Sequence, residues 1–127
     1  MDRSTELLLL AQADLKSAKI LLNTGNDELL QNNAAYHAQQ AVGKNAKALI
    51  ENSGGHGGVG HDIGMLLRDL QTLHILYPEW LDDAAYDISK WATTIRYNAN
   101  FKADHDMISD ILNLTEQWYA DVSDALA

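Results

Sequence analysis

The stretch AYHAQQAVGKNAKAL, residues 35–49, decides the fold class of this chain. Its apolar residues recur at steps of three and four, at Ala35, Ala38, Val42, Ala46 and Leu49. That spacing places them on one face of a helix. Alanine is also the residue with the highest helix propensity. The stretch therefore predicts a long helix whose face of small residues lets a neighbouring helix approach closely.

Four other segments show the same spacing and predict four more helices. They run over residues 8–22, 63–73, 81–95 and 107–122. Capping residues stand in the breaks between them, at Asp27, at Asp62, and at Asp104 or Asp106. Links this short favour antiparallel neighbours. We therefore expect an all-α protein in which residues 1–127 form a single domain, an antiparallel up-and-down four-helix bundle with a fifth helical element.

The composition limits the partners and compartments open to this chain. It contains no cysteine, which excludes disulfides and thiolate metal sites. Its apolar runs fall short of the roughly 18 residues that a membrane span needs, so we expect a cytoplasmic protein without membrane contact. Eighteen acidic residues against nine Lys and Arg give a net charge of −9. Such a charge repels duplex DNA at long range, because phosphate binding needs clustered positive charge.

A polar stripe on the segment 35–49 is the first candidate site. His37, Gln40, Lys44 and Lys47 are spaced three, four and three apart, so they share one helix face, nearly opposite the alanine face. One interpretation is a solvated surface. The other is a strip of hydrogen-bond donors that holds phosphate or packs against a partner.

The end of the fourth predicted helix is the second candidate site, where Arg96, Tyr97 and Asn98 are consecutive. An arginine in a last helical turn often only satisfies terminal carbonyls and the helix dipole. The alternative is a guanidinium that binds phosphate bidentately, with Tyr97 beside it as a stacking surface. The spacing leaves both interpretations open.

A glycine-rich segment, residues 54–60, separates the second and third predicted helices. It lacks the GxxxxGK[ST] fingerprint of a phosphate-binding loop, and no strand precedes it. His56, His61 and Asp62 lie in or next to this segment. Histidines spaced by glycines make a poorly preorganised metal site. We therefore expect no metal ion and no cofactor.

Taken together, these segments resemble the HEPN family (higher eukaryotes and prokaryotes nucleotide-binding domain) over residues 5–124. Residues 9–22 resemble its opening helix and residues 36–49 its hallmark second helix. His61-Asp62-Ile63, followed by Leu66-Leu67, is similar to the histidine–acid pair that starts its third helix. Ile95-Arg96-Tyr97 resembles the arginine that ends its fourth.

The resemblance implies an up-and-down bundle, commonly a homodimer, that binds nucleotides or cleaves RNA without a metal. It also implies a possible protein partner, a minimal nucleotidyltransferase encoded alongside as part of a toxin–antitoxin system. The ribonuclease motif of the family is an arginine followed, after four to six residues, by a histidine. In this chain His105 follows Arg96 only after eight intervening residues, so the motif is not intact. A second departure is Gly43, where the family usually has glutamate before the lysine.

Three hypotheses follow from these features. The leading one is a dimeric protein that binds nucleotide or RNA phosphate and is not an efficient nuclease. The residues expected to bind are His37, Gln40, Lys44, Lys47, Arg96, Tyr97 and Asn98. The enzyme alternative is a metal-independent endoribonuclease with Arg96 and His105 as its catalytic pair. The third is a non-catalytic module that binds a partner protein through its alanine-rich and tryptophan-bearing faces.

Overall fold

A computed structural model describes residues 1–25, 27–55 and 62–127, without the side chains of residues 95 and 96. The described part of the chain forms five α-helices and contains no strand. They are α1 (Arg3–Leu22), α2 (Glu28–Asn52), α3 (Ile63–Thr72), α4 (Trp80–Tyr97) and α5 (His105–Leu126). The all-α fold class is therefore confirmed. Helices α3, α4 and α5 lie close to their predicted ranges, whereas α1 begins five residues before and α2 seven residues before the predicted start.

Aspartate side chains cap the N-termini of four of these helices. The carboxylate of Asp27 accepts hydrogen bonds from the Leu29 and Leu30 N–H groups at 3.0 and 3.1 Å. Asp2, Asp62 and Asp104 cap α1, α3 and α5 in the same way. Each cap satisfies an N–H group that has no partner inside the helix, and its charge lies at the positive end of the helix dipole. The predicted caps at Asp27, Asp62 and Asp104 are confirmed.

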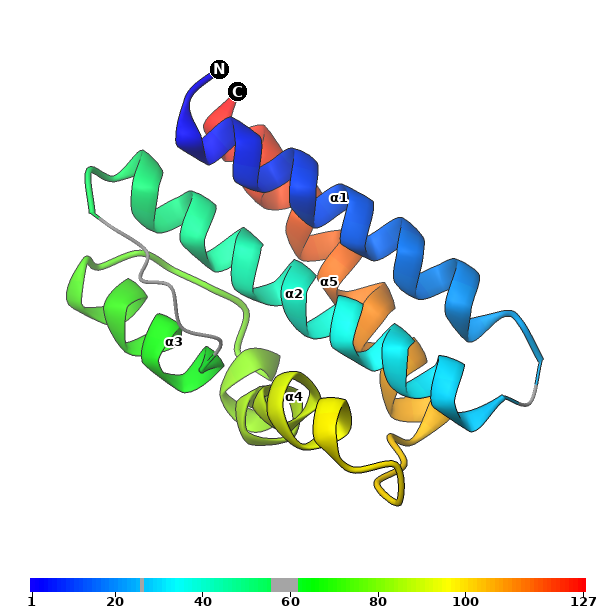
Figure 1. Ribbon diagram of the computed structural model, residues 1–127. Helices are drawn as coiled ribbons and strands as arrows, with labels where there is room; N and C mark the ends of the chain where they lie inside the picture. Colours follow the sequence, from blue (N-terminus) through cyan, green and yellow to red (C-terminus); the bar gives the residue numbers. More distant parts are fainter. Residues whose placement is uncertain (26, 56–61) are drawn as a thin grey trace.

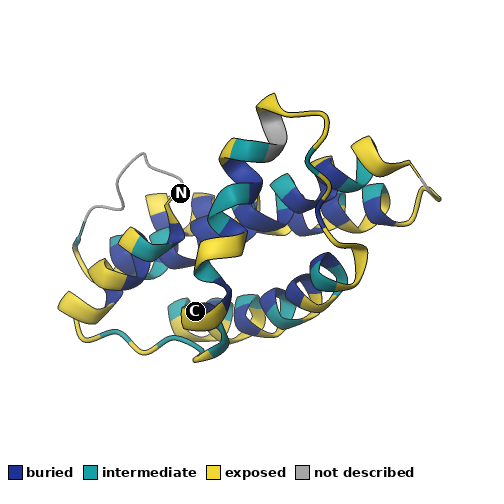
Figure 2. Cartoon of the chain, turned by 90° about the horizontal axis from the view of Figure 1, so that it is seen from below, coloured by how far each residue is buried: buried dark blue, intermediate teal, exposed yellow. Residues whose placement is uncertain are grey.

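Helix α2 is the centre of the molecule (Figure 1). It packs against all four other helices, most extensively against α1, while α1 also contacts α5 and α3 contacts α4. Buried residues face inward on every helix, and exposed residues cover the outside (Figure 2). Because it has neighbours on several sides, α2 needs small residues around most of its circumference.

The alanine-rich face of α2 is buried within the chain itself. Five alanines of α2 have no exposed surface, and a sixth, Ala46, is 1% exposed: the five are Ala34, Ala35, Ala38, Ala41 and Ala48. Trp91 and Trp118 are also buried in the core. In the hypothesis of an interaction module, these faces contact a partner protein; in the structure they contact other helices of the same chain.

None of the helices in the described ranges combines the length and apolar character needed to cross a membrane.

Candidate functional site

A buried carboxylate, Asp14 of α1, joins two residues of the predicted polar stripe. The Nδ1 atom of His37 lies 2.8 Å from Oδ1 of Asp14, and Nζ of Lys44 donates to Oδ2 at 2.5 Å. Both carboxylate oxygens are therefore engaged by α2. His37 and Lys44 are partly buried at the α1–α2 contact, so a fully solvated stripe does not describe these two positions.

The sequence carries a signal for the role of Asp14, although Asp14 is absent from the predicted site residues. Asp14 continues a stripe of α1 whose other members are buried: Leu7, Ala11, Ala18 and Leu22. A charge in an apolar stripe is rarely buried without a partner of opposite charge. His37 and Lys44 lie two helical turns apart on one side of α2, so one carboxylate can contact both. Asp14 also supplies the acidic partner that Gly43 cannot give to Lys44.

Lys47, one turn further along α2, is in a different situation. Partial burial lowers the pKa of Lys47, and the positive charges of Lys44 and Arg3 lower this pKa further. No carboxylate in the described ranges forms an ion pair with Lys47. Its two cationic neighbours each have one: Lys44 pairs with Asp14, and a guanidinium nitrogen of Arg3 lies 3.7 Å from a carboxylate oxygen of Glu6. The start of α1 and the end of α2 therefore bring three cations together, and Lys47 is the one without an acidic partner among the described residues.

Gln40, the remaining residue of the stripe, lies between His37 and Lys44 on α2. The Nε2 atom of Gln40 donates to Oε1 of Gln39 at 2.8 Å, and Gln39 is buried. Gln40 is partly exposed on the same side of α2 as Lys44. The polar stripe is therefore a half-buried edge of the central helix.

The second predicted group lies at the end of α4. Arg96 is in the last turn of the helix, and its side chain lies outside the described part of the structure. The Tyr97 side chain is exposed, and Oδ1 of Asn98 accepts a hydrogen bond from the Asn100 N–H at 3.0 Å. His105 is the first residue of α5, with Nδ1 3.5 Å from Oδ1 of Asp106.

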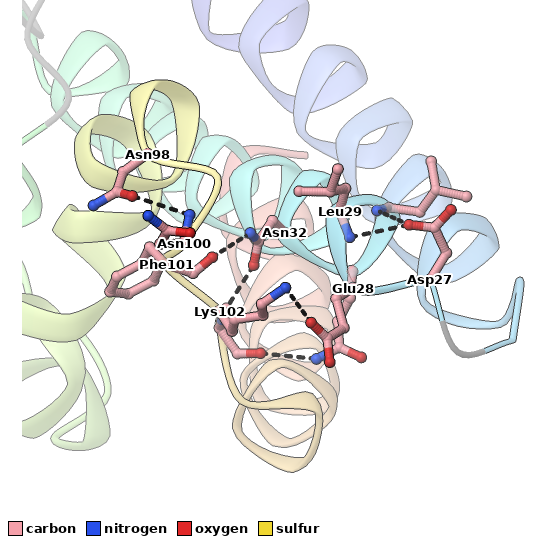
Figure 3. Close-up of polar contacts among 11 residues, drawn as sticks. Asp27, Glu28, Leu29, Asn32, Asn98, Asn100, Phe101 and Lys102 are labelled. Atoms are coloured by element: carbon pink, nitrogen blue, oxygen red, sulfur yellow. Dashed lines mark hydrogen bonds and ion pairs between the residues drawn. The ribbon is translucent and has the colours of Figure 1, made fainter.

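The connection from α4 to α5 is held against the start of α2 (Figure 3). The Asn32 side chain donates to the Phe101 carbonyl at 2.7 Å and accepts from the Ala103 N–H at 2.9 Å. Gln31 donates to the Ala103 carbonyl at 2.8 Å. An asparagine that satisfies both a donor and an acceptor of another segment fixes the path of that segment. Asn32 thereby positions the residues between Arg96 and His105.

The predicted binding residues fall into two groups along α2. The connection is held at Asn32, where an ion pair between Lys102 and Glu28 adds to the contact. Lys47 lies near the other end of α2, about 22 Å away at 1.5 Å per residue. Lys44 and Lys47 therefore form one group with α1, whereas Tyr97 and Asn98 belong to the other end of the helix.

Metal ligands do not gather in the part of the chain that the structure describes. No group of three or more His, Asp or Glu side chains there could hold a metal ion. His56 and His61, the two histidines of the glycine-rich stretch next to Asp62, lie outside the described residues.

These observations define the class of the protein: it is an all-α bundle whose central helix carries a half-buried edge with cationic side chains. The sequence matches the HEPN domain model over residues 4–124, and the chain belongs to the HEPN family. Membership makes it a nucleotide-related or RNase-type module. The predicted resemblance is thus confirmed.

One solved structure is similar over nearly the whole chain. It is TT1696 from Thermus thermophilus, with a TM-score of 0.77 and 27% sequence identity. The match covers 98% of this chain and 98% of that one. None of the curated proteins compared with the sequence matches it.

Proposed function

We propose that this protein binds the phosphate of a nucleotide or of RNA where Lys47, Lys44 and Arg3 meet. The observation that carries the proposal is Lys47, a half-buried cation beside two other cations and without an ion-paired carboxylate in the described ranges. Such an arrangement is unfavourable by itself, because like charges repel and burial disfavours the charged form. A phosphate would offset both effects. In a chain with net charge −9, a cluster of cations is a specific feature.

Asp14 sets how much positive charge this site offers. Its carboxylate already engages Lys44 at 2.5 Å, and Glu6 lies 3.7 Å from Arg3, so Lys47 makes the main contribution to anion binding. His37 shares the same carboxylate. Neutralising Asp14 would release Lys44 toward the ligand and strengthen anion binding.

Isothermal titration calorimetry tests this assignment with ATP, GTP and a short oligoribonucleotide as probes. We expect Lys47→Met to weaken binding about tenfold, as loss of one charge-assisted contact predicts. Lys16→Met is the matched control, because Lys16 is an exposed lysine of α1. Asp14→Asn should bind more tightly than the parent. The assignment fails if the parent binds none of the probes, or if Lys47→Met and Lys16→Met behave alike.

A second candidate function is a metal-independent ribonuclease with Arg96 and His105 as its catalytic pair. The observation in its favour is the contact of Asn32 with the connection between them, because a fixed connection preorganises the groups at its two ends. Cleavage of a labelled RNA that disappears in both Arg96→Ala and His105→Ala would support this activity. Cleavage that persists in His105→Ala would remove that histidine from the mechanism.

We also propose that the protein is a homodimer and pairs with a nucleotidyltransferase in a toxin–antitoxin type system. The support is membership of the HEPN family. Light scattering of the purified protein tests the dimer. A monomer at all concentrations would contradict it.

A further inference from the structure

The link between α3 and α4 exposes a large apolar side chain. Leu76 is 94% exposed, the highest value among the large apolar residues of the described chain. The link holds it in place: the Ile75 N–H donates to the Leu70 carbonyl at 2.9 Å. Tyr77 follows Leu76 in the chain, and its hydroxyl donates a hydrogen bond to Oδ1 of Asp82 at 2.8 Å. Leu76 is therefore presented to solvent by an ordered segment.

Two clefts flank Leu76, and both are lined by Leu76 and Tyr77. The first, about 310 Å³, lies between the link and α5, where Trp118, Val122 and Ala125 form its wall. The second, about 390 Å³, lies between the link and the ends of α3 and α4. Leu76 and Tyr77 thus form an apolar ridge with a cleft on each side, which we call the Leu76 ridge.

Acidic side chains surround the Leu76 ridge. Asp121 lines the first cleft, and Glu79 and Asp82 line the second. No lysine or arginine of the described residues lines either cleft. An apolar centre with a rim of one charge sign is typical of a protein interface.

The negative charge of this rim indicates which kind of molecule can bind to the Leu76 ridge. A second copy of the chain docking through the same face would bring one acidic rim against another, because a twofold interface pairs each patch with itself. A basic partner meets no such repulsion. We propose that the Leu76 ridge docks a basic amphipathic helix of a partner protein, with apolar side chains in the two clefts and Lys or Arg against Asp121, Glu79 and Asp82.

This docking surface is separate from the phosphate site. Leu49 lines the first cleft, whereas Lys47 precedes it by two residues, and two residues turn a helix by about 200°. The two side chains therefore leave α2 on opposite sides. A partner on the Leu76 ridge leaves Lys47 accessible, so the two proposals can be tested independently.

Fluorescence anisotropy with a labelled synthetic peptide tests the docking proposal. The probe is an amphipathic helix of leucine and lysine, and the control peptide has the same composition in a shuffled order. We expect the amphipathic peptide to bind more tightly than the shuffled one. Leu76→Ser should weaken this binding about tenfold, since one buried leucine is lost. Ile20→Ser is the matched control, because Ile20 is 67% exposed on α1.

The acidic rim has a test of its own. The double variant Glu79→Gln, Asp121→Asn should bind the amphipathic peptide more weakly and depend less on salt than the parent. Equal binding of the two peptides, or equal affinity of Leu76→Ser and Ile20→Ser, would overturn the proposal. Sedimentation that shows a parent dimer dissociated by Leu76→Ser would also overturn it, because the occupant would then be a second copy.

Discussion

Two asparagines of α2 are buried to a similar degree but differ in their hydrogen bonds. Asn32 is 3% exposed, and both polar atoms of its side chain bind the connection before α5. Asn45 has no exposed surface, and neither its Nδ2 nor its Oδ1 has a hydrogen-bond partner in the described structure. A buried amide without partners opposes folding, whereas a fully bonded one supports it.

We therefore expect opposite effects from the same substitution at these two sites. Asn32→Ala should lower the free energy of unfolding by about 2 kcal/mol, because it leaves backbone groups unpaired. Asn45→Ala should raise the free energy of unfolding by about 1 kcal/mol, because it removes an unsatisfied amide and adds helix propensity. Urea unfolding of both variants measures the difference. Equal destabilisation would contradict the assignment of Asn45.

Lys47 predicts a pH dependence whose sign can be worked out. Its pKa is lowered in the folded chain, by burial first and then by Lys44 and Arg3, from the ordinary value of 10.5. Between the lowered pKa and 10.5 the unfolded chain binds more protons than the folded one, so stability rises with pH there.

The free energy of unfolding of the parent should therefore rise relative to that of Lys47→Met as the pH is raised toward 10.5. Urea unfolding at a series of pH values measures this difference. The corresponding difference between the parent and Lys16→Met is the control and should be smaller. A difference for Lys47→Met that stays flat or falls would contradict the effect of burial on this lysine.

At the scale of the elements, Gly43 is a weak point in the middle of α2. A Cβ atom at this position would lie 3.8 Å from Leu66 and 3.9 Å from Ile63, which is ordinary van der Waals contact. Gly43→Ala should therefore raise the free energy of unfolding by about 1 kcal/mol through helix propensity. Gly55→Ala is the contrasting variant, since its Cβ would lie 3.0 Å from Ile50.

Thermal unfolding followed by circular dichroism compares the two variants. Gly43→Ala should melt at a higher temperature than the parent, and Gly55→Ala at a lower one. If Gly43→Ala melts below the parent, α3 packs more tightly on α2 than the structure shows.

At the scale of the whole molecule, the excess of acidic over basic residues determines how the free energy of unfolding responds to salt. Nine more acidic than basic residues leave a net repulsion that ion pairs such as Lys19–Glu116 do not cancel. Screening this repulsion favours the compact state. The free energy of unfolding should rise by about 1 kcal/mol between roughly 0.05 and 0.5 M NaCl.

Urea unfolding at several NaCl concentrations measures this increase. The double variant Asp83→Asn, Asp110→Asn, which neutralises two exposed acids, should show a smaller increase than the parent. Stability that falls with salt would mean that attractive ion pairs outweigh the repulsion.

The sequence by itself determined the five helices, the caps of α2, α3 and α5, and the family. These features depend on residues a few positions apart: the apolar steps of three and four, and a carboxylate such as Asp27 that accepts from the next turn. They can therefore be recognised without knowing which helices are neighbours. The apolar stripes also predicted the bundle, because each needs another helix to cover it.

Only the tertiary structure decided how the candidate residues are arranged. Asp14 meets His37 and Lys44 across 23 and 30 positions, and Asn32 meets Ala103 across 71. Periodicity assigns each residue to a face of its own helix but does not say which face of another helix lies opposite. The neutralisation of Lys44 by Asp14 and the contact of Asn32 with the connection before α5 both follow from packing around α2. The exposure of Leu76 belongs to the link between α3 and α4, whose path the spacing of apolar residues does not determine.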